Sequence, residues 1–258
     1  MSNNSKIEWT DATWNPVMGC TPISPACDHC YARAMIKRFG GCNKGFPERP
    51  DDVTLYPERL KRPLCWKKPR RVFVCSMSDL FHEDVPDEYI GDVWKAMAKS
   101  TQHTFMVLTK RPERMLRWFS QYWIPAVNYK PDSVMLPNVW LGVTAENQEY
   151  FDYRTSLLKQ CRAPVLFVSI EPMLGQIDYD GRLDLVICGG ETGPGARPMK
   201  REWAESLLDQ CLDTGTPFFF KGWGTATLQK SDSAYRLLLG QTWEQIPEAT
   251  VGQGRLKL

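Results

Sequence analysis

The sequence predicts an α/β fold, a partial (β/α)6 barrel with an additional C-terminal strand. Short, continuously apolar runs recur along the chain, as buried parallel strands do. Segments with helical spacing of apolar residues separate several of these runs. A polar segment directly follows each run, at the strand end where α/β proteins place their chemistry. A doubly wound sheet is the competing arrangement.

Composition bounds the class of protein. The chain has 258 residues, of which 43% are hydrophobic and 24% charged, as in ordinary globular proteins. We find no internal repeat and no long linker, and we expect a single domain over residues 1–258. No apolar run approaches the ~20 residues that span a bilayer, and residues 1–6 lack targeting character. Nine cysteines without a signal peptide favour the reducing cytoplasm.

The first part of the chain contains the most unusual segment. Residues 13–19 are predicted to form a strand that leads into a proline-rich loop. We define the cysteine-loop segment as residues 14–33, which includes most of this strand and the start of the helix that follows. Helical spacing begins at Cys30 and continues to Phe39, where Gly40 and Gly41 end it. Residues 42–71 form an irregular, basic insertion with no clear periodicity.

After this insertion the pattern becomes regular. Strands are predicted at residues 71–76, 105–108, 139–143, 165–168 and 185–188, with 217–221 as the additional strand. A helix is predicted from about Asp87, with Pro86 just before it. Another is predicted to start at Pro112, the position that proline favours, and its apolar face extends to Tyr122.

Three cysteines of the loop, Cys20, Cys27 and Cys30, are spaced six and then two residues apart. Zinc usually takes four ligands, and only one C-x2-C pair is present, although Cys42, His29 or His82 could complete a site. A disulfide would leave one thiol over and suits secreted proteins. Three thiolates without an obvious fourth ligand fit an iron–sulfur cluster with one iron open to an exogenous ligand.

The motif WNPxxGCxxxSPxCxxCYA resembles the phage Gp37/Gp68-like family. Further similar segments follow in order, at residues 139–148, 167–175, 186–199, 218–224 and 238–247. The resemblance implies a fold of the radical S-adenosylmethionine (SAM) type, with a [4Fe-4S] cluster and SAM as cofactors. Most radical SAM enzymes have C-x3-C-x2-C, whereas this chain has C-x6-C-x2-C. The resemblance also implies a three-cysteine-motif partner protein.

Polar groups at the strand ends are candidates for binding the cofactor. Tyr31 follows the last cysteine and could stack on an adenine ring. Asp79, which follows the second strand, is the candidate for a polar SAM contact, with helix capping as its alternative. Glu146 could bind a ribose hydroxyl or cap a helix, and capping is the favoured role of Asn147. The remaining candidates at the strand ends are Ser76, Thr109, Lys110, Gly189, Gly190 and Glu191.

Two residues are candidate catalytic groups. Glu171 follows an apolar run directly, and a carboxylate is costly to bury without a partner. Lys221 follows three phenylalanines and could reach a phosphate. Both occur at predicted strand ends, so we expect them on the same rim as the cysteines.

A cluster of cations with one tryptophan predicts contact with nucleic acid. Cations and aromatic rings together suit phosphate backbones and unstacked bases, although a basic run is often only a solvated face. The net charge of +2 adds no argument. The residues are Lys61, Arg62, Trp66, Lys67, Lys68, Arg70 and Arg71.

The leading hypothesis is an enzyme that cleaves SAM reductively and acts on a nucleic acid or nucleotide, in base modification or lesion repair. Electron transfer into the sulfonium would give methionine and a 5′-deoxyadenosyl radical, and an electron donor is required. One alternative is a zinc-stabilised, non-catalytic nucleic-acid-binding protein. Another is a cluster-containing component that needs a partner protein for activity.

Overall fold

A seven-stranded parallel sheet organises the computed structural model, which describes residues 5, 7–42, 45–121 and 135–248. The strand order follows the sequence without reversal. Each neighbouring pair is parallel. The strands are β1 (Ala12–Trp14), β4 (Arg71–Val74), β5 (Thr104–Thr109), β6 (Val139–Thr144), β7 (Leu166–Ile170), β8 (Leu185–Gly189) and β9 (Phe218–Gly222).

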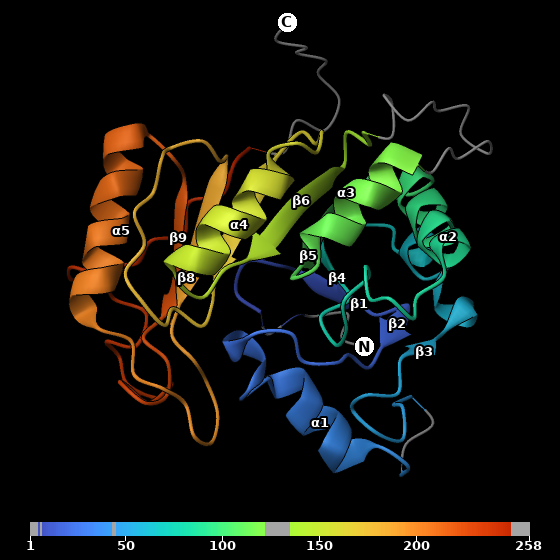
Figure 1. The fold of residues 1–258 in the computed structure, drawn as a ribbon, viewed down its shortest axis with the longest axis horizontal. Helices are drawn as coiled ribbons and strands as arrows, with labels where there is room; N and C mark the ends of the chain where they lie inside the picture. The colour runs from blue at the N-terminus through green and yellow to red at the C-terminus, as the bar shows by residue number, and fades with distance from the viewer. Residues whose placement is uncertain (1–4, 6, 43–44, 122–134, 249–258) are drawn as a thin grey trace, which may run out of the picture.

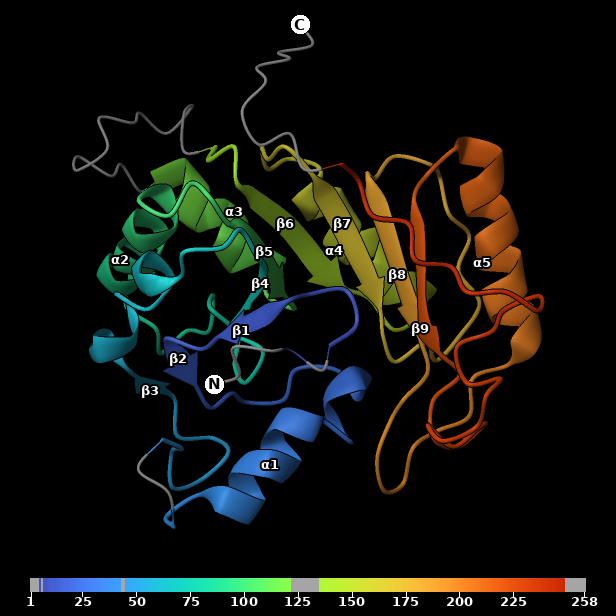
Figure 2. The same ribbon diagram turned by 180° about the vertical axis from the view of Figure 1, so that it is seen from behind.

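Four helices cover one face of this sheet (Figures 1 and 2). They are α2 (Asp87–Ala98), α3 (Pro112–Gln121), α4 (Gln148–Leu158) and α5 (Arg201–Thr214). A doubly wound sheet would reverse its strand order and carry helices on both faces, so the partial barrel with an additional strand is confirmed.

No helix in the described ranges has both the length and the apolar character to cross a membrane. Tyr122, predicted on the face of α3, lies outside the described residues.

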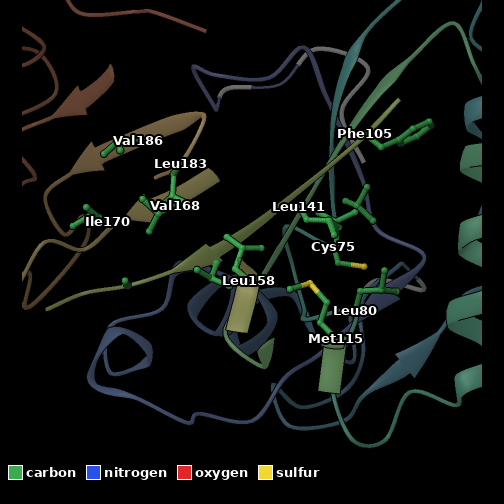
Figure 3. Close-up of a cluster of buried hydrophobic side chains, with 14 of the residues drawn as sticks. Cys75, Leu80, Phe105, Met115, Leu141, Leu158, Val168, Ile170, Leu183 and Val186 are labelled. Atoms are coloured by element: carbon green, nitrogen blue, oxygen red, sulfur yellow. The ribbon is translucent and has the colours of Figure 1, made fainter. Parts of the chain in front are cut away.

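Alternating side chains fill the two faces of the sheet. On the helix side, Val72 and Val74 join a large core, part of which Figure 3 shows around Leu141 and Val168. On the opposite, concave side, Phe73 joins a second cluster that includes Trp9, Met106, Trp140 and Phe167. The strands are therefore buried on both faces, which explains their continuously apolar sequence.

A close approach inside the concave cluster requires a glycine. A Cβ atom on Gly142 would lie 2.4 Å from the Phe167 ring. Glycine in β6 therefore makes room for a large ring from β7, and the two strands pair directly beside it. This explains a small residue within an otherwise bulky strand.

The first predicted strand was too long. Residues 13–19 divide into β1 and β2 (Val17–Met18), and Pro16 between them has no N–H group for a ladder. Strand β2 pairs antiparallel with β3 (Thr54–Leu55), which lies inside the insertion predicted to be irregular. Short 3-10 helices also occur: η1 (Pro25–Cys27), η2 (Pro57–Arg59) and η3 (Pro63–Cys65).

Helix α1 (Tyr31–Phe39) confirms the helix predicted after the last loop cysteine. It lies apart from the four covering helices, beside the end of the sheet toward which the arrowheads of β6, β7 and β8 point (Figure 2). The loop that contains the three cysteines leads into α1 and therefore reaches the carboxyl ends of the strands.

Candidate functional site

A cavity of about 190 Å³ lies at the carboxyl ends of the strands. Side chains of the concave cluster, among them Trp9 and Phe73, line its apolar part. Cys20, Cys27 and Cys30 line the same cavity. The fold thus brings the cysteine loop and the strand ends together around one space, as the sequence predicts.

Most of the predicted rim residues also line this cavity. They come from α1 and from the last residues of five strands or the segments that follow them, and they are Tyr31, Ser76, Asp79, Thr109, Lys110, Glu171, Glu191 and Lys221. Gly189, Gly190 and Glu146 are not among the lining residues. Convergence from so many separate segments is typical of active sites in barrels.

The two glycines act by leaving space. A Cβ atom on Gly189 would lie 3.1 Å from the Cβ of Lys221 and 3.6 Å from the Cγ of Glu171. On Gly190, it would lie 2.1 Å from the backbone oxygen of Trp223. Gly189 therefore leaves space for the lysine and the glutamate, and Gly190 lets the segment after β9 pack closely.

Arg111 holds Cys20 in place. Its Nη1 lies 3.6 Å from the Cys20 Sγ, and its Nη2 donates to the Oγ1 and backbone oxygen of Thr21 at 3.0 and 3.2 Å. Arg33 of α1 donates to the Cys20 carbonyl at 2.7 Å. Burial and the Asp79 carboxylate raise the pKa of the Cys20 thiol to about 12, although Arg111 opposes this shift. The free thiol is therefore protonated near neutral pH, and any metal that bound Cys20 would have to displace that proton.

Glu191 and Arg197 fix the second half of the loop. Arg197 donates to Glu191 Oε1 at 2.6 Å and to the Pro25 carbonyl at 2.7 Å, and it pairs with Asp28 at 3.2 Å. The Nδ1 of His29 lies 3.0 Å from Glu191 Oε2. Burial alone would raise the pKa of Glu191, but hydrogen bonds from Arg197 and His29 lower it to about 2. Glu191 is thus committed to holding the loop.

Glu146 differs most from its expected role. It is fully buried, pairs with Arg154 at 3.0 Å, and accepts a hydrogen bond from the backbone N–H of Ala26 in the cysteine loop at 3.3 Å. Glu146 is therefore not positioned to contact a ribose in this structure. Asn147 caps α4 as predicted, because its side chain accepts from the N–H of Tyr150.

Asp79 connects two strand ends. Its Oδ1 accepts from the Thr109 hydroxyl at 2.7 Å and from the N–H of Phe81 at 3.0 Å. Its Oδ2 accepts from the N–H of Lys110 at 3.0 Å. The bond to Phe81 resembles the capping alternative, whereas the bonds to residues 109 and 110 join the segments that follow β4 and β5. Asp79 lines the cavity but already has these partners.

Glu171 and Lys221 form an ion pair on the cavity wall, with Lys221 Nζ donating to Glu171 Oε1. Their side chains are 22% and 21% exposed. The carboxylate that the sequence makes costly to bury therefore has a cationic partner from β9. Both groups can reach a ligand in the cavity.

Tyr31 and Ser76 meet at the cavity mouth. The Tyr31 hydroxyl donates to the Ser76 carbonyl at 2.6 Å, and the ring is 45% exposed. The turn before Ser76 contains Cys75 with a φ of +59°, a conformation that residues other than glycine rarely adopt. Asn15 holds this turn by accepting from the Met77 N–H at 3.1 Å.

The donor set fits an iron–sulfur cluster in its chemistry. All nine cysteines are free, and Cys20, Cys27 and Cys30 line the cavity at intermediate exposure. Cys75 also lines the cavity, but it is buried. Within the described ranges, no three Cys, His, Asp or Glu side chains are already gathered as a metal site. Two of the three suggested additional zinc ligands have other partners: His82 Nε2 lies 2.8 Å from the Thr21 hydroxyl, and His29 contacts Glu191. Cys42, the third, is exposed and does not line the cavity.

The basic insertion lies elsewhere. None of its seven predicted residues lines the cavity. Trp66 is only 8% exposed and packs edge-on against His103, with ring centroids 5.6 Å apart, so its ring belongs to the core. Arg71 begins β4, at the opposite end from the cavity, and lies 3.8 Å from Asp11. Lys61, Lys67 and Lys68 are exposed.

Sequence reasoning missed the residues that hold the loop. From the sequence, Arg111 is only a cation at a strand end that could bind a carboxylate or a phosphate, and Arg154 and Arg197 carry no motif signal. The contacts of Arg111 with Thr21 and of Arg197 with Pro25 join residues that lie 90 and 172 positions apart in the sequence. Arg154 supports the loop through Glu146.

A family model described as "Protein of unknown function (DUF5131)" matches residues 4–247. The chain belongs to the DUF5131 family. No curated protein sequence matches this DUF5131 protein significantly. A solved structure of a spore photoproduct lyase mutant is similar, with a TM-score of 0.45 and 11% sequence identity. The alignment covers 91% of the DUF5131 chain and 66% of the lyase chain, so the DUF5131 protein spans just under two thirds of that length.

Proposed function

We propose that this DUF5131 protein is a radical SAM enzyme that acts on a nucleic acid or nucleotide, in base modification or lesion repair. The observation that carries the proposal is the convergence of Cys20, Cys27 and Cys30 on one cavity at the carboxyl ends of a partial barrel. The motif resemblance to the phage Gp37/Gp68-like family supports the same reading.

In this proposal Cys20, Cys27 and Cys30 hold a [4Fe-4S] cluster. Tyr31, Ser76 and Lys110 are the lining groups that we assign to SAM, whereas the Thr109 hydroxyl is already bonded to Asp79. When bound, the two cofactors supply a one-electron reductive cleavage of a carbon–sulfur bond, and hence an organic radical that can abstract a hydrogen atom. An external electron donor is required.

The chain's own contribution is to position the ligands and exclude water. Arg111 keeps Cys20 beside the strand ends, and Arg197 anchors the loop at Pro25 and Asp28, on either side of Cys27. Trp9 and Phe73 give the cavity an apolar wall that limits water. Lys221 Nζ donates to Glu171 Oε1, and together the two side chains present a polar pair to a substrate group in the cavity.

Anaerobic purification with iron, sulfide and zinc analysis tests the cofactor assignment. Iron and sulfide in a four-to-four ratio are expected for the wild-type protein, as a [4Fe-4S] cluster requires. Cys27→Ala should lose most of the iron. Cys65→Ala is the matched control, because Cys65 is an exposed cysteine outside the loop, and it should keep the iron.

Zinc in place of iron would favour the non-catalytic, nucleic-acid-binding alternative. A loaded cluster that reacts only in the presence of a second protein would favour the alternative of a partner-dependent component, such as one that acts with a three-cysteine-motif protein. Since thiols that bind iron must stay reduced, the proposal also places the protein in the cytoplasm.

A further inference from the structure

A second pocket, of about 570 Å³, lies between α3 and α4 and adjoins the cavity. Lys110 and Arg111 line both spaces. Five of its lining residues are cations and two are acids, so the wall is positively charged. The cations are Lys110, Arg111, Arg114, Arg117 and Arg154, and the acids are Glu83 and Glu113. We call this space the α3–α4 pocket.

Three of the five cations are committed to the protein itself. Arg154 pairs with the buried Glu146, and Arg111 donates to Glu83 Oε2 at 3.0 Å. Arg114 donates to Asp87 Oδ1 at 2.6 Å and to the Val85 carbonyl at 2.7 Å. These contacts fix the walls of the pocket. Because each of the three arginines already has a partner within the protein, its charge is only partly available to a ligand.

The other two cations have no such commitment. The side chains of Lys110 and Arg117 form no ion pair or hydrogen bond with any residue in the described ranges. Lys110 lies at the border with the cavity, and Arg117 is an exposed residue in the second turn of α3. An anion in the pocket would meet both, and the fixed guanidinium plane of Arg117 suits two oxygens of a phosphate.

Aromatic rings complete the wall. Tyr150 and Tyr153 of α4 both line the pocket, and Tyr153 is 50% exposed. Arg154 lies 4.2 Å from the centroid of the Tyr150 ring, which keeps that ring in position. Rings beside uncommitted cations are the combination that binds nucleotides through base stacking and phosphate contacts.

We infer that the α3–α4 pocket binds a phosphate ester of the substrate, beside the cavity where the reaction takes place. That a reaction takes place in the cavity rests on the proposed function. Binding of a phosphate ester in the α3–α4 pocket does not depend on it. The phosphate belongs either to a mononucleotide or to the backbone of a single strand. Under this inference, the main contact with nucleic acid lies at the rim of the sheet rather than on the basic insertion.

Binding of a fluorescein-labelled single-stranded oligonucleotide tests the inference by fluorescence anisotropy. A length of about 12 nucleotides lies within the usual site size. Lys110→Ala combined with Arg117→Ala is compared with Lys67→Ala combined with Lys68→Ala, which removes as much charge from the basic insertion. We expect binding to weaken at least about tenfold in the first variant, because charge-assisted contacts are lost, and to stay within about twofold in the second.

Salt dependence gives a readout of the contacts themselves. The slope of log Kobs against log salt should become shallower by about 1.4 in the pocket variant, since each phosphate contact on a single strand contributes about 0.7. Competition by unlabelled adenosine monophosphate would support a mononucleotide site, and competition only by unlabelled oligonucleotide would support a strand. Absence of binding by the wild-type protein, or equal weakening in both variants, would overturn the inference.

Single Arg117→Ala separates this inference from the proposed function. Arg117 does not line the cavity, so the variant should fold and keep its iron while losing affinity for the oligonucleotide. Iron retained with unchanged affinity would reject the pocket and leave the cluster standing. Affinity lost from a protein that never holds iron would reject the cluster and leave the pocket standing.

Discussion

The cysteine loop and the basic insertion are the two clusters of candidate functional residues in the sequence, and their surroundings in the structure differ. The loop is held by charged side chains that follow β5, β6 and β8, through Arg111, Glu146 and Glu191. The insertion buries its one tryptophan and contributes no residue to the cavity. A cluster in sequence thus becomes a site only where the fold brings distant partners to it.

The largest effect should come from breaking the buried pair behind the loop. Arg154→Ala leaves the carboxylate of Glu146 buried without a charge partner, and we expect the free energy of unfolding to fall by about 3–5 kcal/mol. Urea denaturation measures this. Lys159→Ala is the control, because its pair with Asp180 is partly exposed and should cost less than about 1 kcal/mol. If both variants lost the same free energy of unfolding, the large stabilisation assigned to the buried Glu146–Arg154 pair would be contradicted.

Trp66 tests whether the basic insertion contributes to the core or to nucleic-acid binding. Trp66→Ala removes a core ring that packs on His103, and the free energy of unfolding should fall by about 3 kcal/mol. Trp66→Phe keeps much of the volume and should cost clearly less. If Trp66→Ala instead left stability unchanged and weakened oligonucleotide binding, the ring would be a base-stacking surface after all.

Acid should loosen the loop through Glu191. The pKa of this carboxyl is about 2 in the folded protein and near 4.5 when unperturbed, so its stabilisation is complete above pH 4.5 and is lost as pH falls toward 2. We expect the difference in unfolding free energy between wild type and Glu191→Gln to shrink by up to about 3 kcal/mol over that range. Urea titrations at several pH values measure it. A difference independent of pH would contradict the role of the carboxylate.

The smallest effect is expected at the exposed lysines of the insertion. Lys67→Ala combined with Lys68→Ala should change the free energy of unfolding by less than about 0.5 kcal/mol, because these side chains are exposed. Thermal unfolding with parallel iron analysis measures both properties. Loss of iron in this variant would show that the insertion, and not only the rim, supports the loop.

Local sequence patterns predicted the elements well but not the contacts between them. Continuously apolar runs located β4 to β9 because both faces of the sheet are buried, and polar residues after them located the cavity rim. The single strand predicted over residues 13–19 ignored the missing N–H of Pro16. The buried role of Glu146 depends on Arg154, whose position on α4 has no signature of its own. Trp66 looked exposed because its sequence neighbours are charged.

The central claim is that the three loop thiols hold a cluster that binds SAM. Electron paramagnetic resonance of the dithionite-reduced protein, recorded with and without SAM under anaerobic conditions, tests it most directly. The account predicts a [4Fe-4S] signal that SAM changes and that Cys27→Ala abolishes, while Cys65→Ala retains it. A colourless wild-type protein that contains zinc and gives no signal under the same conditions would contradict it.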